Sequence, residues 1–510
     1  MKFPAQARAS FIAVLLCVAP FFVLPIPPMS DLSDHVLVAR ILAQYHNPTL
    51  GFDKYFSVHW ELHSGIATYA LLSAMQSVAS PFVGARVYLV TWVVALWASV
   101  YFLARCCGSK APWAAALAAL PLTFGWYVYT GLLPFIATIP LFALIVGFWN
   151  AEIPSRIKIP LVACFLCVSF LFHVVGAGAA VVALCVSYIC TRFTGDAHPG
   201  KWWHLALSIA PVTLLTVNFL YGSHRPHAVV HWTSPLANIK PCISFTVGAL
   251  STVAAILLLL WLLGLAAALL VRGRLWSRSS HVLVVPALVL AGIACVLPVT
   301  FGSLWPAGPR LLPFALLLLI AAVAWEAIQV RLLVSGMLAL IVGLSASTSF
   351  KAAALRSDFD DFLSGREFVT SGARLLPILV NPNEGSHWVQ PFWSLASAYT
   401  ITSGGENPYV FADPFVQTAA SPLRYRAPET TRQFASLLGK PMEPAEYRGV
   451  SRSYDYVLVW GLWPQLEAVL ADEMTLLHRQ GRLVIYGSRP GDAAQPRRLI
   501  EGATPETLLQ

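Results

Sequence analysis

Long apolar runs separated by short polar segments dominate residues 1–349, and they limit the fold of this chain more than any other feature. Hydrophobic residues make up 57% of the 510 residues and charged residues only 11%, a composition typical of membrane proteins. A helix needs about 20 apolar residues to cross a bilayer. We therefore expect a mostly α-helical, polytopic membrane protein with about eleven transmembrane helices, at Ser10–Leu24, Phe82–Leu103, Ala111–Tyr129, Leu132–Trp149, Ile157–His173, Ala177–Cys190, Trp202–Tyr221, Ile243–Val271, Val282–Phe301, Leu311–Trp325 and Leu332–Ser347.

Basic residues between these runs indicate an orientation. Lys2 and Arg8 precede the first run, and no small-residue cleavage site precedes Asp31, so we expect an uncleaved first helix with a cytoplasmic N-terminus. If Ile66–Ser80 does not cross the bilayer, most other basic residues fall on the cytoplasmic side, as the positive-inside rule requires. We therefore expect a bacterial inner-membrane protein whose C-terminal part is periplasmic or extracellular. The basic residues are scattered, so the net charge of +9 does not predict nucleic-acid binding.

The composition changes after residue 349 to that of a soluble domain. Leu375–Val380, Tyr456–Trp460 and Leu483–Tyr486 are short apolar runs typical of buried strands, and Leu466–Arg479 has a helical pattern. The chain therefore divides into a transmembrane domain over residues 1–349, with a first outer loop at 29–65, and an extracytoplasmic α/β domain over residues 350–510.

Two carboxylates at the start of the first outer loop have two competing interpretations. Asp31 and Asp34 stand three residues apart where a helix is expected to begin, so they are suited to cap orphan backbone N–H groups. Alternatively, one of them is a catalytic base or a ligand of a divalent cation at the membrane surface. The expected topology places both just outside the bilayer, and this placement favours the functional interpretation.

Other polar residues are expected on the same face. His59, Glu61 and His63 form an H-x-E-x-H pattern, which differs from the H-E-x-x-H of zinc proteases and favours a substrate-lining or interfacial role over metal binding. His173 lies at the end of one apolar run, and Arg310 directly precedes another. An arginine in this position can bind phosphate, or its side chain can extend to the membrane interface. A third set lies in a loop that contains a proline: His224, His227 and His231.

The segment Ser30–Ile41, SDLSDHVLVARI, resembles the acidic start of the first outer loop in the GT-C superfamily of membrane glycosyltransferases. This superfamily includes protein O-mannosyltransferases, lipid A aminoarabinose transferases and the catalytic subunits of oligosaccharyltransferases. The C-terminal segments YDYVLVW and RLVIYGS are also similar to parts of its outer domains. The Trp-Trp-Asp signature of oligosaccharyltransferases is absent, because His204 follows Trp202–Trp203, so transfer to asparagine is disfavoured.

The resemblance implies transfer of a sugar from a polyprenyl-phosphate carrier to an extracytoplasmic glycan, lipid or protein. Asp31 or Asp34 would deprotonate the acceptor, or would bind a divalent cation such as Mg²⁺ or Mn²⁺. Family members often carry nearly adjacent acidic residues, so the three-residue spacing leaves the choice of base open. The alternatives are a transporter or flippase for a lipid-linked anion and an inactive GT-C-like scaffold. The expected substrate-binding residues are His35, His59, His63, His173 and Arg310.

Overall fold

A computed structural model gives the fold of most of the chain. The predicted span Ile243–Val271 and the predicted loop residues His224 and His227 lie outside the described residues. The structure describes residues 5–194, 201–222, 230–235, 281–301, 306–327, 330–380, 390–411, 421–427, 431, 433–435 and 441–489.

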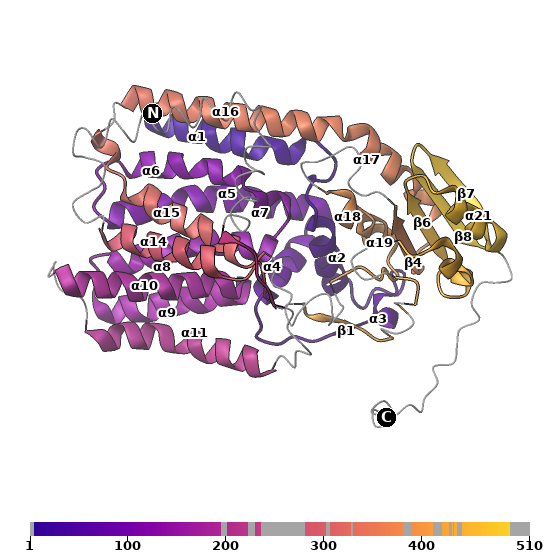
Figure 1. Ribbon diagram of the computed structural model, residues 1–510, viewed down its shortest axis with the longest axis horizontal. Coiled ribbons are helices and arrows are strands. Elements are labelled where there is room, and N and C mark those ends of the chain that lie inside the picture. Colours follow the sequence, from indigo (N-terminus) through magenta and orange to yellow (C-terminus); the bar gives the residue numbers. More distant parts are fainter. Residues whose placement is uncertain are drawn as a thin grey trace.

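Helices that lie side by side form the larger part of the described chain (Figure 1). Six of them are long and apolar enough to cross a membrane, so the expectation of an integral membrane protein is confirmed. The count of eleven spans stays a prediction. The six helices are α5 (Pro81–Cys106), α8 (Leu133–Asn150), α9 (Ser155–Phe172), α10 (Val174–Thr194), α11 (Trp202–Gly222) and α16 (Val330–Ala354).

Four further apolar helical segments are shorter than a full span. In three of them a proline lies where α and 3₁₀ geometry meet, because proline lacks the N–H that continues an α-helix. The predicted helix Ala111–Tyr129, for example, changes at Leu120–Pro121 from α to 3₁₀ geometry. The segments are α1 (Ala5–Val18) with η1 (Ala19–Phe22), α6 (Pro112–Ala119) with η2 (Leu120–Phe124), α14 (His281–Val296), and η3 (Gly308–Leu311) with α15 (Leu312–Ala322). A short helix α7 (Trp126–Tyr129) follows η2.

The helix α4 (Ile66–Gln76) is too short to cross a bilayer. Its 11 residues span about 16 Å at 1.5 Å per residue, about half of the hydrocarbon thickness. It is also absent from the described helices that are apolar and long enough to span. This length agrees with the expectation that Ile66–Ser80 stays on one side.

Residues 29–65, the first loop, hold regular structure. They form α2 (Leu32–Ala43), α3 (Phe52–Tyr55) and the strand β1 (Phe56–Val58). These elements lie between the membrane helices and the C-terminal elements (Figure 1). The strand β1 pairs antiparallel with β5 (Leu423–Tyr425), so the first loop and the C-terminal region share a sheet.

The C-terminal region contains a four-stranded mixed sheet in the order β4-β6-β8-β7. The strands β4 and β6 are parallel and the other pairs are antiparallel. The strands are β4 (Leu375–Leu379), β6 (Tyr456–Trp460), β7 (Met474–Gln480) and β8 (Leu483–Ser488), and the helices are α17 (Arg356–Leu363), α18 (Phe392–Leu395), α19 (Ser397–Ser403) and α21 (Pro464–Glu473).

The prediction of a helix over Leu466–Arg479 is wrong for the second half of this segment. The helix α21 ends at Glu473, and β7 begins at Met474. The residues of β7 pair with β8 and Met474 is buried, so pairing with a distant strand overrides the local helical pattern.

The two faces of this sheet belong to different cores. Alternate residues such as Leu458 and Trp460 join the continuous core of the membrane helices, whereas Val457 and Val459 pack in a separate core with α21. Successive strand residues point to opposite faces, so one sheet closes both cores. The C-terminal region therefore does not rely on its own core alone. Helix α16 also continues through residue 349 to Ala354.

Candidate functional site

Asp31 lies at the N-terminus of α2, and its side chain does not cap the helix. Its backbone N–H donates to the carbonyl of Thr130 over 2.9 Å. Gly131 has a positive φ of 84°, and a Cβ on it would lie 2.9 Å from the backbone nitrogen of Leu32, so only glycine allows this close approach. The half-buried Asp31 carboxyl has a pKa raised to about 7 by burial, and the charge of Arg310 partly opposes that rise.

Asp34, one helical turn later, is almost completely buried, with 3% of its surface exposed. Its Oδ1 accepts a 2.5 Å hydrogen bond from the hydroxyl of Ser397 in α19. Burial raises the pKa of Asp34 well above its ordinary value; the Ser397 hydrogen bond lowers it, and the nearby Asp31 adds to the rise. The interpretation of Asp34 as a simple helix cap is therefore not supported.

His35 completes the polar start of α2. Its Nδ1 lies 3.0 Å from the hydroxyl of Tyr69 in α4, and its ring meets Phe411 edge-on at 4.9 Å between centroids. Burial lowers the pKa of His35 to about 3, so the imidazole is neutral at physiological pH. A neutral imidazole can donate one hydrogen bond and accept another.

Arg310 and His173 bring a cation to the same site from the membrane helices. His173 forms the turn between α9 and α10 in an extended conformation, and Arg310 in η3 is buried with 6% exposed. The Nη1 of Arg310 lies 2.9 Å from the Nε2 of His173, and its Nε donates to the carbonyl of Pro306. The guanidinium also lies 5.5 Å from the ring centre of Phe135. It is therefore fixed from several sides in a position where it interacts with Asp31.

The two histidines of the H-x-E-x-H pattern have different surroundings. Residues 59–62 are not helical, so the i, i+4 geometry that would place His59 and His63 on one face does not arise. His59 is exposed and its Nε2 contacts the hydroxyl of Ser57. His63 is buried, and its Nδ1 lies 2.9 Å from the carbonyl of Ser64. Among the residues that the structure describes, its Nε2 has no hydrogen-bond partner, and it is the nitrogen left to accept one.

His63 nevertheless lies near the His173 turn. The N–H of Val174 donates to the Ser64 hydroxyl, and the N–H of Gly65 donates to the carbonyl of Leu171, each over 2.9 Å. The end of the first loop is thus bonded to the chain on both sides of this turn. His231, of the third histidine set, is exposed in the short strand β2 (Val230–His231), which pairs with β3 (Thr300–Phe301).

The residues for a metal site do not come together in the part of the chain that the structure describes. No group of three or more His, Cys, Asp or Glu side chains is arranged to hold an ion there. Asp34 accepts a hydrogen bond from the Ser397 hydroxyl, and the charge of Arg310 lowers the pKa of Asp31.

Sequence reasoning missed the residues that surround the carboxylates from other elements. Ser397 and Asn407 come from the C-terminal region and Tyr69 from α4, and none belongs to a motif that indicates such a role. Their proximity to Asp34 and His35 arises only when the first loop packs against α4 and α19.

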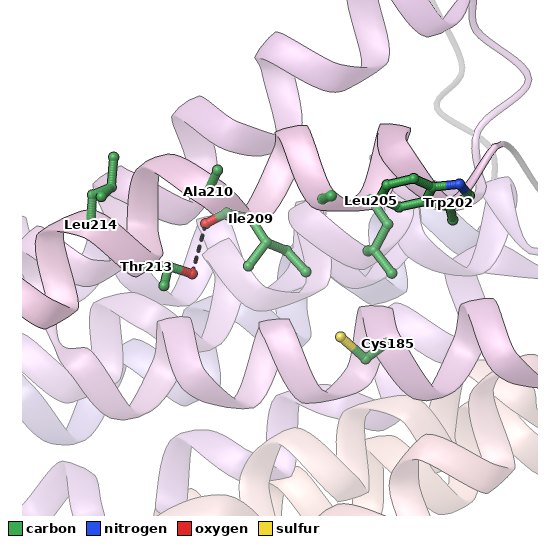
Figure 2. A pocket seen from close by; sticks show the side chains of 8 residues that line it. Cys185, Trp202, Leu205, Ile209, Ala210, Thr213 and Leu214 are labelled. Atoms are coloured by element: carbon green, nitrogen blue, oxygen red, sulfur yellow. Dashed lines mark hydrogen bonds between the residues drawn. The ribbon is translucent and has the colours of Figure 1, made fainter.

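An apolar crevice lies elsewhere on the molecule, between α10 and α11 (Figure 2). It has a volume of about 560 Å³, and its lining includes Cys185, Trp202 and Leu205. The walls are almost entirely apolar, which is typical of a surface in contact with lipid tails. It lacks the acid–base groups present at the start of α2.

Comparison with solved structures shows what this architecture is similar to. ArnT from Cupriavidus metallidurans bound to undecaprenyl phosphate is 11% identical, with a TM-score of 0.59 over 96% of this chain and 99% of that chain. Its apo state is 12% identical, with a TM-score of 0.55 over 96% and 98% of the two chains. The mycobacterial arabinofuranosyltransferase AftD is 15% identical, with a TM-score of 0.50 over 96% of this chain and 42% of that one.

These similarities confirm the GT-C resemblance at the level of the fold. They extend over nearly the whole chain, and thus include the first loop and the C-terminal region as well as the membrane helices. No protein-family model and no curated protein matches the sequence.

Proposed function

Because the chain has the GT-C fold, we propose that it is a membrane glycosyltransferase that moves a sugar from a polyprenyl-phosphate carrier to an extracytoplasmic acceptor. The fold is shared with a transferase seen bound to undecaprenyl phosphate. The observation that carries the proposal is a partly exposed aspartate, Asp31, at the start of α2, with the buried Arg310 close enough for its charge to lower the pKa of that carboxyl. A base for the acceptor and a cation for the carrier phosphate are thus close together.

Asp31 is the better candidate for the general base. A base acts best when its pKa is near the working pH and when the acceptor can reach it. The pKa of Asp31 is about 7 and its side chain is half-buried, whereas Asp34 is buried and bonded to Ser397. Asp31 would take the proton from the acceptor hydroxyl while that oxygen attacks the anomeric carbon.

Arg310 would stabilise the leaving group. As the bond between the anomeric carbon and the phosphate oxygen breaks, its electron pair stays on the carrier phosphate. A guanidinium binds phosphate through two parallel donors, and His173 together with the carbonyl of Pro306 fixes its direction. Electrostatic stabilisation of this kind is often the largest contribution to catalysis.

The remaining predicted site residues would contact the substrates. His35, neutral and beside Tyr69, can exchange hydrogen bonds with sugar hydroxyls. His63 presents Nε2 as an acceptor to a hydroxyl donor. His59 is exposed and would meet only an acceptor that approaches from solvent. A cation-assisted role for Asp31 or Asp34 is less favoured, because the described residues do not gather the ligands for it.

The same proposal fixes an orientation. The carrier would reach Arg310 laterally from the outer leaflet, with the N-terminus cytoplasmic and the C-terminal region on the periplasmic or extracellular side. The distribution of basic residues supports this arrangement. A transporter or an inactive scaffold would not need a carboxyl such as that of Asp31, with a pKa near 7, close to the buried Arg310.

The test is sugar transfer by the purified protein in lipid nanodiscs. We expect transfer from a polyprenyl-phosphate sugar by the wild type and a loss of at least about 100-fold in Asp31→Asn. Asp53 is an exposed carboxylate in the same loop, so Asp53→Asn is the matched control and should remain active. Full activity in Asp31→Asn, or transport of the carrier without sugar transfer by the wild type, would refute the proposal.

A further inference from the structure

A hydrogen-bond relay connects the C-terminal region with the first turn of α2. The amide Nδ2 of Asn407 donates to the Ser397 hydroxyl over 3.1 Å, and that hydroxyl donates to Oδ1 of Asp34 over 2.5 Å. Ser397 and Asn407 each have 1% of their surface exposed. The relay therefore lies in the interior, where hydrogen bonds are strong and unmade ones are costly.

The direction of each hydrogen bond follows from its neighbours. The N–H of Tyr409 donates to Oδ1 of Asn407 over 3.0 Å, so the other amide atom must be the NH₂ group that faces Ser397. Ser397 accepts from Asn407 through one of its lone pairs and donates its single proton to Oδ1 of Asp34. Oδ1 of Asp34 is thus held as an acceptor in one orientation.

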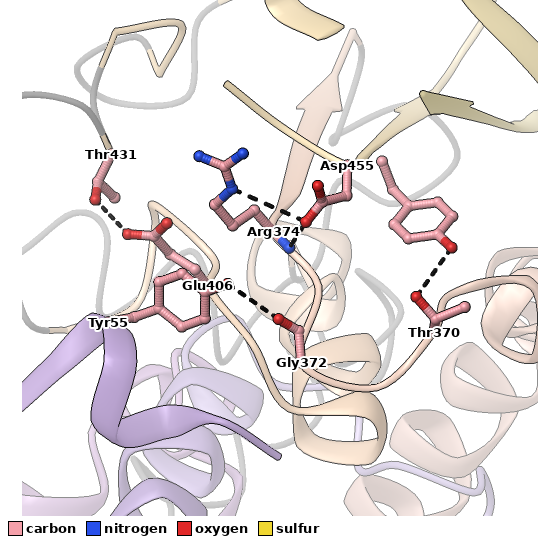
Figure 3. Close-up of polar contacts among 8 residues, drawn as sticks. Tyr55, Thr370, Gly372, Arg374, Glu406, Thr431 and Asp455 are labelled. Carbon is pink, nitrogen blue, oxygen red and sulfur yellow. Dashed lines mark hydrogen bonds and ion pairs between the residues drawn. The ribbon is translucent and has the colours of Figure 1, made fainter. Parts of the chain in front are cut away.

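Asn407 is itself held from both sides. The hydroxyl of Tyr425 donates to the backbone carbonyl of Asn407 over 2.7 Å. Tyr425 belongs to β5, which pairs with β1 of the first loop. The preceding residue, Glu406, is buried and accepts from Thr431, as Figure 3 shows. These contacts make Asn407 a rigid support for Ser397.

Asp31 and Asp34 lie three residues apart in the first turn of α2, so they share one side of the helix. A second bond, from the N–H of Ser33 to the hydroxyl of Ser394 over 3.3 Å, holds the same turn. Fixing Asp34 and the backbone of Ser33 therefore also fixes the backbone from which the Asp31 side chain extends.

We propose that Ser397 and Asn407 are positioning residues that orient the catalytic turn of α2 from the C-terminal region. This inference rests on the proposed glycosyl transfer. Neither residue touches the reacting atoms; both act through Asp34. The C-terminal region thereby becomes part of the machinery that aligns the base, in addition to any contact it makes with the acceptor.

The experiment compares Ser397→Ala with Ser403→Ala. Both serines are buried in α19, but the Ser403 hydroxyl donates only to backbone carbonyls beside it, such as that of Tyr399. We expect kcat to fall roughly 10- to 100-fold in Ser397→Ala, since small displacements of a catalytic group have effects of this size. KM for the polyprenyl-phosphate sugar should stay within about twofold, which is typical of an interaction that acts in the transition state.

Two further variants test the direction of the relay. Ser397→Thr keeps the hydroxyl and should recover most of kcat. Asn407→Asp keeps the acceptor for Tyr409 but replaces the amide donor, and should lower kcat in the same way as Ser397→Ala. Equal kcat in Ser397→Ala and Ser403→Ala, or no recovery in Ser397→Thr, would overturn the inference.

Hydrogen–deuterium exchange provides a readout that does not need activity. The peptide covering α2 should exchange faster in Ser397→Ala than in the wild type and should be unchanged in Ser403→Ala. Unchanged exchange in Ser397→Ala would contradict the positioning role even in an active enzyme. Absence of sugar transfer by the wild type would reject the proposed function instead, so the two failures are distinguishable.

Discussion

The Nη1 of Arg310 lies 2.9 Å from the Nε2 of His173, across 137 residues of sequence. A guanidinium only donates hydrogen bonds, so this Nε2 must be an acceptor and the imidazole must be neutral. The pair joins the turn between α9 and α10 to η3, and it fixes the cation that lowers the pKa of Asp31 at the start of α2. The site of the proposed reaction is built on this relationship.

The pH dependence of sugar transfer should report the ionisation of Asp31. A base must be deprotonated to act, and the pKa of Asp31 is about 7. We expect kcat/KM to rise about tenfold per pH unit below pH 7 and to level off above it. Initial rates between pH 5 and 9 measure this. A rate that is constant from pH 5 to 7 would exclude Asp31 as the base.

Substitution of Arg310 should affect both the carrier and the base. In Arg310→Gln the cation that lowers the pKa of Asp31 is absent, so the rising part of the pH profile should move to higher pH. Loss of a bidentate phosphate contact should also reduce kcat/KM by roughly 100-fold or more. Arg452→Gln, at an exposed position in the C-terminal region, is the control and should leave both quantities unchanged.

Glu406 should make the protein less stable as the pH rises. Burial raises its pKa to about 7 from 4.5, so the folded state binds the proton more tightly than the unfolded state. The free energy of unfolding then falls as the pH increases from about 4.5 to about 7. Glu406→Gln keeps an acceptor for Thr431 (Figure 3) and removes this contribution.

Melting temperatures in detergent at pH 5, 6, 7 and 8 test this expectation. The decline with pH should be shallower in Glu406→Gln than in the wild type, and unchanged in Asp360→Asn, which alters an exposed carboxylate of α17. Identical slopes in Glu406→Gln and the wild type would show that Glu406 does not titrate in this range.

The contact between the first loop and the C-terminal region should depend on Gly405. Its φ is +81°, its N–H donates to the carbonyl of Leu50 over 2.7 Å, and an added Cβ would collide with the carbonyl of Ala373. Gly449 has a similar φ of +84° with open space around it. Gly449→Ala should therefore cost about 1 kcal/mol, and Gly405→Ala more than about 2 kcal/mol.

Thermal unfolding of the two variants in the same detergent separates these costs. Because both carry the same backbone penalty, the difference between them measures the steric conflict at Gly405. Equal stability of Gly405→Ala and Gly449→Ala would mean that the backbone of Ala373 does not lie against residue 405 as the structure has it.

The apolar runs of the sequence by themselves determined a membrane-embedded helical protein, because a water-soluble fold could not bury so many apolar side chains in its interior. The strands β4, β6 and β8 were also predicted, since their runs are short, apolar and bounded by turn residues. Asp31 and Asp34 were selected because carboxylates beside a membrane helix are unusual.

Only the tertiary structure decided which groups surround these carboxylates. Ser397 bonds to Asp34 across 363 residues of sequence, and no local pattern encodes such a contact. The strand β7 likewise forms because β8 lies beside it. The charge of Arg310 acts on Asp31 because segments distant in sequence pack together. Burial and long-range hydrogen bonding, which set the pKa of each carboxyl, are properties of the packed chain.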